Sequence, residues 1–386
     1  MFQRIIGQIS RYKLYIIGGS ALVLRLLIGV YFFHKFDTPN LINATRRLVD
    51  DANPFDIYLT SNIGYPFAKP PLWAIMVLPF VLLFDGTSWI YLGVKIPVIL
   101  ADFGCAYLIR EYFLELDQKK LSFYGWVFWL FNPICIYTSA YEGSAESVML
   151  LFLLLTLKNK ENTWKQGLYL ALGLLTKIQF IIFILPVLVH KGLNTSLEKR
   201  IQIGIMIVGI FTAVCLPFYI YNPERMLYSL FLRHEGRPPG KITWWTFALL
   251  LPDTLYTFFD NVMNYAVEFV LITNILIVYL TRKQENSTRV CLLAVLAFLV
   301  TSNTVFLRYF TMLIPWMIFY ELERREYILH LFTNVVFFMG IILEFFQSTE
   351  TFIFLGGLFV ALLCAIYLFK VVYEMKLEES MLTKSG

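Results

Sequence analysis

The sequence predicts an all-α polytopic membrane protein, a bundle of about twelve spans with a polar loop outside the membrane after the first span. Of its 386 residues, 58% are hydrophobic and 15% are charged, and the mean hydropathy is +0.66. A soluble domain carries about 25% charged residues, so this composition excludes a chain built around one soluble core. Apolar runs of spanning length recur along the chain, and helices satisfy their own backbone hydrogen bonds in lipid.

Net charge and cysteine usage narrow the class of protein further. The net charge of +5 is modest, and in a membrane protein it indicates basic cytoplasmic loops rather than nucleic-acid binding. The five cysteines all fall within apolar runs, with neither a CxxC pair nor metal-ligand spacing. We interpret them as buried thiols.

The apolar runs give the order of the expected helices. Runs of spanning length lie near 14–34, 91–110, 121–138, 201–221, 262–281, 327–346 and 351–373. Shorter runs lie near 71–84, 144–157, 166–176, 178–190, 289–304 and 306–320. The first run follows Arg4, Arg11 and Lys13 and precedes no small-residue cleavage site, so we expect a retained helix.

Basic residues set the predicted orientation. Besides the N-terminus, they cluster at Lys158/Lys160/Lys165, Lys191/Lys199/Arg200, Arg282/Lys283/Arg289, Arg324/Arg325 and Lys370/Lys376. The positive-inside rule places these clusters, and both termini, in the cytoplasm. We expect one membrane-embedded domain over 1–386. No repeat of 20–50 residues is visible in the sequence.

The stretch 166–190 begins and ends at inside clusters and is therefore expected to form a hairpin. Its tip is TKIQ, which contains Lys177, and each arm has only about a dozen residues. Such a tip should lie in a cavity lined by protein rather than in lipid. The same assignment of loops to the inside and the outside leaves 71–84 without a crossing to make. This short run contains Pro79, and we expect it to be re-entrant or interfacial.

The predicted outer face then collects most of the polar residues that lack an obvious structural role. It contains 35–70, 139–143, the Lys177 tip, 222–246 and 302–305. Within it, 35–70 is the candidate catalytic loop, with an amphipathic segment after Asp37, and 222–246 is the candidate donor-binding loop.

Acidic residues supply the first candidates. Asp37 follows the first span and is either a helix-end carboxylate in solvent or a general base facing a cleft. Asp102 lies inside a span seven residues after Lys95, where a structural Lys–Asp arrangement and a substrate contact are both open. Glu142 and Glu146 lie four residues apart at the outer end of a span, where a helix N-terminus also favours acids.

Basic residues supply the second group. Lys177 at the hairpin tip is hard to explain structurally. Arg233, His234 and Arg237 lie between aromatic residues in 222–246, a set that suits a phosphate-bearing lipid or an ordinary interfacial loop. Arg308 begins a predicted span, where it either snorkels or joins the phosphate ligands.

One acid and several bases at an outer membrane surface fit sugar transfer from an isoprenoid phosphate. The positively charged side chains would neutralise the leaving phosphate, and the carboxylate would take the proton of the attacking hydroxyl. A single base with direct displacement inverts the anomeric centre. No P-loop, GxGxxG or HExxH pattern offers nucleotide or zinc chemistry.

The order of these features resembles the GT-C superfamily of polyprenyl-phosphate-sugar glycosyltransferases, in particular the catalytic subunit of GPI mannosyltransferase I and the family 87 mannosyltransferases. The resemblance runs from the first span to about Arg308. Asp37 and the turn at Pro54 are similar to that family's Asp and its G-x-x-P-[YF] turn. The other matching stretches are YPFAKPPLW, which contains Lys69, WLFNPICIYTSAYEGSAESVMLLFLLL, GLLTKIQFIIFILP and LRHEGRPPGKITWW.

The resemblance implies a GT-C-type bundle and a role for each matching residue. Asp37 would be the catalytic base, and Lys177, Arg233, His234 and Arg237 would bind the donor phosphate. Glu146 would be a site acid. Two departures matter: Lys35 replaces the first acid of an Asp-x-Asp pair, which speaks against a divalent metal held there, and Glu142 replaces an Arg. No cofactor is otherwise required.

The leading hypothesis is an inverting hexosyltransferase that moves mannose from a polyprenyl (dolichyl) phosphate to a lipid-linked or glycan acceptor. Glucose or arabinofuranose on the same carrier remains open. A transporter or flippase of lipid-linked sugars would also need a basic, aromatic cavity, although such proteins often contain repeats. A non-catalytic scaffold is the third class. We expect a plasma-membrane or ER protein with its active site on the outer or luminal face, contacting membrane lipid, and the resemblance admits a small accessory subunit.

Overall fold

The computed structural model describes residues 2–50, 53–58, 67–190, 196–231, 252, 255, 261–262, 265–281, 286–302, 305–324, 335 and 350–385, and every regular element in them is helical. The chain divides into two compact units. The first contains 1–155, 172–178 and 210–230, and the second contains 156–171, 179–209 and 231–386.

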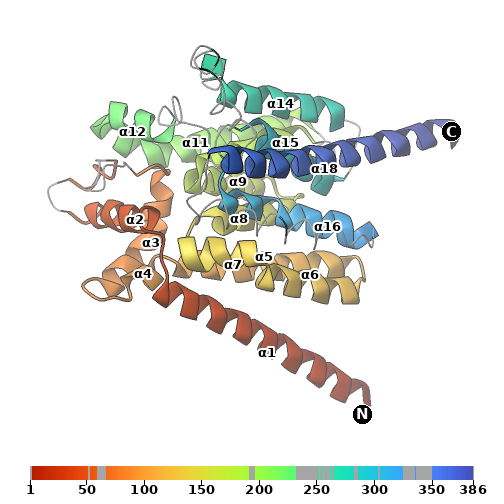
Figure 1. Cartoon of the computed structure of the whole chain (residues 1–386), viewed down its shortest axis with the longest axis horizontal. Coiled ribbons are helices and arrows are strands. Elements are labelled where there is room, and N and C mark those ends of the chain that lie inside the picture. The colour runs from red at the N-terminus through yellow and green to blue at the C-terminus, as the bar shows by residue number, and fades with distance from the viewer. Residues whose placement is uncertain are drawn as a thin grey trace. The chain divides into compact units, whose positions relative to one another are not determined.

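The first unit carries most of the N-terminal helices (Figure 1). They are α1 (Phe2–Tyr31), α2 (Asp37–Arg47), α3 (Pro71–Phe84), α4 (Ile90–Gly93), α5 (Ile96–Glu115), α6 (Lys119–Phe131), α7 (Pro133–Ile136), a π-helix (Tyr137–Glu142), most of α8 (Glu146–Lys158) and α12 (Pro223–Leu230). The ends of α9 (Thr163–Thr176) and α11 (Leu197–Tyr221) also belong to it.

Two spanning segments of this unit differ in their surroundings. Ile90–Glu115, made of α4 and α5, is 72% buried in protein, whereas Tyr12–Tyr31 of α1 is 17% buried. Both are apolar enough to cross a membrane, so the exposed apolar face of α1 is suited to contact with lipid. α5 packs most extensively on α6 and forms the centre of the unit.

The polar stretch after α1 contains the amphipathic helix that the sequence predicts. Thr38, Leu41, Ile42 and Thr45 of α2 are buried, at the i, i+3, i+4, i+7 spacing of one helix face. This face packs on α3 and its neighbours in an apolar core that includes Trp73. The core therefore fixes where α2 begins, at Asp37.

The predicted run 121–138 is broken in the structure. Its first part is α6, which ends before Asn132 and Pro133. The Asn132 side chain accepts hydrogen bonds from the backbone N–H groups of Ile134 and Cys135, at 2.9 and 3.3 Å, and Pro133 occupies the first turn of α7. A π-helix follows and ends at Gly143, which has a left-handed φ of 64°. π-Helical turns often occur at functional sites.

The second unit contains α10 (Ile181–Val189), the first parts of α9 and α11, α14 (Ala266–Thr281), α15 (Ser287–Thr301), a 3₁₀-helix (Leu307–Met312), α16 (Ile314–Arg324) and α18 (Glu350–Ser385). α15 is its core helix, because every residue from Val290 to Leu299 is buried. Asn286 caps α15 by accepting a hydrogen bond from the Thr288 backbone N–H at 3.0 Å. α14 and α18 each pack along α15 (Figure 1).

The described residues contain four helical segments long and apolar enough to span a membrane: Tyr12–Tyr31, Ile90–Glu115, Leu197–Tyr221 and Leu358–Glu378. Shorter apolar helices are Pro71–Phe84, Ile178–Val189, Glu268–Thr281 and Ser287–Thr301. The expected run 327–346 lies outside the described residues except for residue 335. The expected 71–84 is α3, whose 14 residues rise about 21 Å, less than the roughly 30 Å of the hydrocarbon layer.

Candidate functional site

The candidate site of the first unit is built around the turn from Glu142 to Glu146. This turn joins the π-helix to α8, and Glu142, Ser144 and Glu146 are all buried in it. Three elements reach it from elsewhere in the chain: the start of α2, the start of α5 and the end of α9. The structure therefore brings several predicted site residues together, as the following contacts describe.

Asp37 occupies the first position of α2, with 41% of its side chain exposed. Its backbone N–H donates to His34 Nδ1 at 3.1 Å, and its Oδ2 lies 3.9 Å from the same nitrogen. The next residue, Thr38, is buried and donates from Oγ1 to the Glu142 carbonyl oxygen at 3.5 Å. The start of α2 is thus held against the turn while the Asp37 carboxylate stays accessible to a ligand.

Lys95 caps the end of α1. It lies at the start of α5, is fully buried, and its Nζ donates to the carbonyl oxygens of Gly29, at 3.1 Å, and of Phe32. A cation at a helix C-terminus satisfies carbonyls that have no partner within the helix. A Cβ on Gly143 would lie 2.8 Å from Lys95 Cγ, so the turn and this lysine are closely packed.

Glu146 and Lys177 form a buried ion pair between Oε1 and Nζ, with 0% and 5% of their side chains exposed. Glu146 begins α8, and Lys177 lies in the break between α9, which ends at Thr176, and the 3₁₀-helix Ile178–Phe180. The predicted break at TKIQ is confirmed, and its lysine lies within protein. The sequence did not indicate the pairing of these two residues.

Glu142 is also buried, and the Tyr137 hydroxyl donates to its Oε1 at 3.2 Å. Tyr137 stacks on Tyr141, with ring centroids 5.1 Å apart and an interplanar angle of 21°. Glu142 stands where the family that the sequence resembles has an Arg. Its carboxylate is therefore held inside the π-helix segment.

Asp102 pairs with Arg25 rather than with Lys95, which corrects the expected arrangement. Arg25 Nε donates to Asp102 Oδ2 at 2.9 Å, and both side chains are 0% exposed. Arg25 also donates to the Leu130 carbonyl oxygen at 2.7 Å, and Trp129 Nε1 donates to the Asp102 carbonyl oxygen at 2.9 Å. Seven residues of helix separate Lys95 and Asp102 by about 10 Å, too far for an ion pair along the axis. The network joins α1, α5 and α6.

Lys69 lies before α3 and is partly exposed. Its ammonium is 5.5 Å from the ring centroid of Trp73, a cation–π distance. The buried Tyr58 hydroxyl donates to the Lys69 carbonyl oxygen at 3.1 Å. Burial raises the pKa of Tyr58 well above its usual value, so the phenol remains a donor that fixes the backbone beside the lysine.

The remaining predicted bases lie elsewhere. Arg308 belongs to the second unit, where its guanidinium lies 4.5 Å from the Phe306 ring centroid and 5.9 Å from that of Tyr309. Arg233, His234 and Arg237, with most of the loop 222–246, lie outside the described residues. Among the described residues, no group of three or more His, Cys, Asp or Glu side chains is arranged to hold a metal ion.

The arrangement has two chemical capabilities. Asp37 presents a carboxylate at the start of a helix, where it can accept a proton from a hydroxyl group. Lys177 and Lys69 supply positive charge in and beside the packed core, where electrostatic interactions are stronger than in water. Such groups are suited to stabilising an anionic leaving group.

Neither a protein-family model nor a curated protein sequence matches the chain. Among solved structures, it is similar to ArnT from Cupriavidus metallidurans in the apo state, with 11% identity and a TM-score of 0.52 over 94% of this chain and 78% of that one. It is likewise similar to ArnT from the same organism bound to undecaprenyl phosphate, with 13% identity and a TM-score of 0.52 over 94% of this chain and 72% of that one.

At these identities the likeness establishes the fold and nothing finer. The chain shares the helical fold of ArnT, which confirms the all-helical architecture that the sequence predicts. The likeness extends over nearly the whole chain, so it includes residues of both units.

Proposed function

We propose that the protein is a membrane-embedded glycosyltransferase that takes its sugar from a polyprenyl-phosphate carrier. The observation that carries this proposal is the ArnT fold, because one of the two ArnT structures contains bound undecaprenyl phosphate. The first unit adds residues suited to the reaction, with an accessible carboxylate at Asp37 and a buried lysine at Lys177.

The reaction follows from the charges. The acceptor hydroxyl oxygen attacks the anomeric carbon, and its proton passes to the Asp37 carboxylate. The bond between that carbon and the phosphate oxygen breaks, and polyprenyl phosphate leaves with the electron pair. Positive side chains stabilise the developing phosphate charge, with Lys177 and Lys69 as contributors in the first unit. Arg233, His234, Arg237 and Arg308 are further proposed phosphate ligands.

The turn from Glu142 to Glu146 explains how these groups would keep their geometry. Thr38 holds the start of α2 to the turn, Lys95 holds the end of α1 beside it, and Glu146 holds Lys177. A displacement of about 1 Å in such a site can reduce the rate about a hundredfold, so these contacts matter to transfer even where they touch no substrate.

The finer features of the proposal are a hexose donor, with mannose tested first, and direct displacement with inversion. Inversion follows from the use of one carboxylate, because retention requires a second carboxylate as nucleophile. The acceptor is a lipid-linked saccharide or another glycan. The active site is proposed to face the outer or luminal side, where the positive-inside rule places 35–70.

The test is transfer of radiolabelled mannose from synthetic polyprenyl-phosphate-mannose to a membrane lipid extract. We expect label in product with the wild type and a loss of at least about a hundredfold with Asp37→Asn, because removal of a general base typically costs 10²- to 10⁴-fold. Asp117→Asn is the matched control, since Asp117 is 90% exposed and lies in a helix connection.

Each other outcome has a distinct meaning. Full transfer by Asp37→Asn would remove Asp37 from the mechanism. The wild type could fail to transfer sugar from mannose, glucose and arabinofuranose donors and yet move the donor across liposome membranes. That result would show a transporter of lipid-linked sugars rather than an enzyme. Inversion is checked separately from the anomeric configuration of the product.

A further inference from the structure

His34 lies between the end of α1 and the start of α2, beside the proposed general base. Its Nδ1 accepts a hydrogen bond from the Asp37 backbone N–H at 3.1 Å, and its carbonyl oxygen accepts one from the Thr38 N–H at 3.4 Å. Phe36, which directly precedes the helix, makes no side-chain capping hydrogen bond. The first N–H groups of a helix have no acceptor within that helix, so His34 supplies acceptors for two of those of α2.

Packing fixes the backbone on the α1 side of His34. The Phe33 ring stacks on the Tyr91 ring, with centroids 4.1 Å apart and an interplanar angle of 9°. The Lys95 ammonium donates to the Phe32 carbonyl oxygen. The His34 side chain itself is 20% exposed. The position of the imidazole at the start of α2 is therefore set by the residues that precede it.

The hydrogen bond from Asp37 shows which nitrogen of the neutral imidazole carries the proton. A nitrogen that accepts a hydrogen bond offers a lone pair, so Nδ1 of His34 is unprotonated and the proton of the neutral ring is on Nε2. Ser, Thr and Asn are common acceptors at helix starts, and they do not gain a proton at physiological pH. An imidazole is the side chain whose charge ordinarily changes between pH 5 and pH 8.

Protonation of His34 would change its relation to Asp37 in two ways. Both nitrogens of an imidazolium are donors, so Nδ1 could no longer accept the Asp37 N–H. Asp37 Oδ2 lies 3.9 Å from the same nitrogen, so the new positive charge would face the carboxylate. A cation at this distance favours the ionised carboxylate and lowers its affinity for a proton. Asp37 would then be a weaker base toward the acceptor hydroxyl.

The charged groups around His34 make Asp37 the one on which this change acts. Among the described residues, the Asp37 carboxylate is the acidic group within 4.0 Å of the imidazole nitrogens. Lys35, the next residue in the chain, is exposed. Lys95, from α5, directs its ammonium to carbonyl oxygens at the end of α1. Glu142, from the π-helix, accepts a hydrogen bond from a tyrosine hydroxyl.

We propose that His34 is a positioning residue for the general base: its neutral imidazole holds the backbone of Asp37, and its protonation both releases that contact and weakens the base. The catalytic part of this inference rests on the proposed function, whereas the hydrogen bond between the two residues does not. The decline of sugar transfer on the acid side of the pH profile is therefore assigned to His34 rather than to Asp37.

The test is the pH profile of sugar transfer from polyprenyl-phosphate-mannose by the full-length protein in detergent, between pH 5 and pH 9. His34→Asn offers a side-chain oxygen to the Asp37 N–H but cannot be protonated. We expect it to keep kcat within about threefold of the wild type at pH 8 and to transfer about tenfold faster than the wild type at pH 5. His34→Ala offers no acceptor and should lose about ten- to a hundredfold in kcat at pH 8, with KM for the donor retained.

The hydrogen bond is checked without the reaction by ¹⁵N NMR of the full-length protein labelled at histidine. The signals of His34 are those that disappear in His34→Asn. At pH 8, Nδ1 should have the chemical shift of an unprotonated ring nitrogen and Nε2 that of a protonated one. As the pH is lowered, both signals should move to imidazolium values over the range in which wild-type kcat declines.

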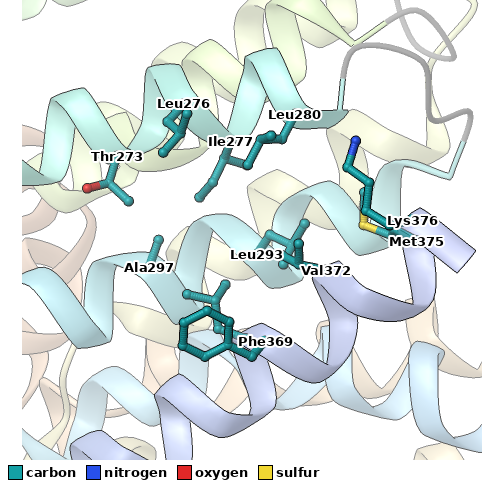
Figure 2. Close-up of a pocket in the computed structure, with 11 residues that line it drawn as sticks. Thr273, Leu276, Ile277, Leu280, Leu293, Ala297, Phe369, Val372, Met375 and Lys376 are labelled. Carbon is teal, nitrogen blue, oxygen red and sulfur yellow. The ribbon is translucent and has the colours of Figure 1, made fainter.

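A control variant removes a titratable side chain from the second unit. Lys376 lines an apolar groove of about 230 Å³ between α14, α15 and α18 (Figure 2). Lys376→Gln should keep both the wild-type rate at pH 8 and the wild-type decline toward pH 5. A pH profile that changes in His34→Asn and not in Lys376→Gln would tie the decline to His34.

Three results would overturn the proposal. One is a decline toward pH 5 that is the same in His34→Asn and the wild type. Another is a wild-type kcat in His34→Ala at pH 8, and the third is a protonated Nδ1 on His34 at pH 8. All three leave the proposed function intact, because the wild type still transfers sugar. Absence of transfer by the wild type at every pH would instead refute the proposed function, and the catalytic role of His34 with it.

Discussion

Lys177 and Glu146 form an ion pair that is almost completely buried, although the two residues belong to different helical segments. Removing one member of such a pair leaves an uncompensated charge in the interior, whereas replacing both by apolar residues of similar volume is often neutral or stabilising. This difference separates a structural role of Lys177 from a role in binding phosphate.

We expect Lys177→Met or Glu146→Met alone to reduce the free energy of unfolding by about 3–5 kcal/mol. The double variant should recover most of that stability but should still fail to transfer sugar, because the positive charge is absent. Denaturant unfolding in detergent and the transfer assay measure the two effects. Recovery of activity in the double variant would show that Lys177 serves stability alone.

The Arg25–Asp102 pair should behave as a structural connection between α1 and α5. Asp102→Leu leaves a buried guanidinium without its carboxylate, and we expect a loss of about 3–5 kcal/mol in the free energy of unfolding. Molecules that remain folded should keep wild-type transfer per mole. A variant of normal stability with greatly reduced transfer would instead place Asp102 among the substrate contacts.

Lys95 should act as a positioning residue for the start of α2. Lys95→Met removes the cap from the carbonyl oxygens of Gly29 and Phe32, so the chain leading from α1 to Asp37 loses its anchor. We expect kcat to fall by about ten- to a hundredfold while the affinity for the donor is retained. Lys119→Met, at a lysine 83% exposed, is the control and should change neither quantity. A fall in donor affinity at constant kcat would make Lys95 a ligand instead.

The exposed pair of Arg46 and Asp85 gives a pH-dependent contribution to stability. Arg46 lowers the pKa of Asp85 from its ordinary value near 4, through hydrogen bonds from Nε and Nη2 at 3.1 and 2.5 Å. A carboxylate with a lowered pKa in the folded state stabilises the protein above its unfolded-state pKa. The contribution is lost as the pH falls through the lower, folded-state value.

Comparing the melting temperatures of wild type and Asp85→Asn between pH 2 and pH 6 checks this. The difference between them should be present at pH 6, shrink below about pH 4 and decrease in high salt, because both side chains are half exposed. A difference that is constant over this range would show that the ion pair contributes nothing measurable.

Some parts of the site follow from sequence patterns because they depend on local spacing. The amphipathic segment after the first span was predicted, and the buried face of α2 has the spacing of one helix face. The break at Lys177 was predicted because 166–190 begins and ends at basic clusters on the same side of the membrane, and the structure places the residue between two helical elements. The all-helical fold was predicted from the recurring apolar runs, and the likeness to the helical fold of ArnT confirms it.

Other parts were missed because they depend on contacts between distant segments. A Lys95–Asp102 arrangement was one of two open interpretations, because the residues lie seven apart on one predicted helix, yet each finds its partner on α1. The sequence did contain one indication of the Asp102 partner, which is Arg25 in the first apolar run. A charged residue inside an apolar run usually pairs with another charged residue. The Glu146–Lys177 pair had no comparable signal, because neither residue lies within an apolar run of spanning length.

The Arg25–Asp102 pair also has a consequence for how the chain is assembled. Its partners are 77 residues apart in sequence, so α1 leaves the ribosome with a guanidinium inside its span well before the carboxylate exists. At about 5–20 residues per second, the delay is roughly 4–15 s. An isolated arginine at the centre of a helix raises the apparent free energy of insertion by about 2.5–3.5 kcal/mol. During this interval Arg25 is without its carboxylate, so we expect α1 to insert less readily than a fully apolar helix until α5 has been made.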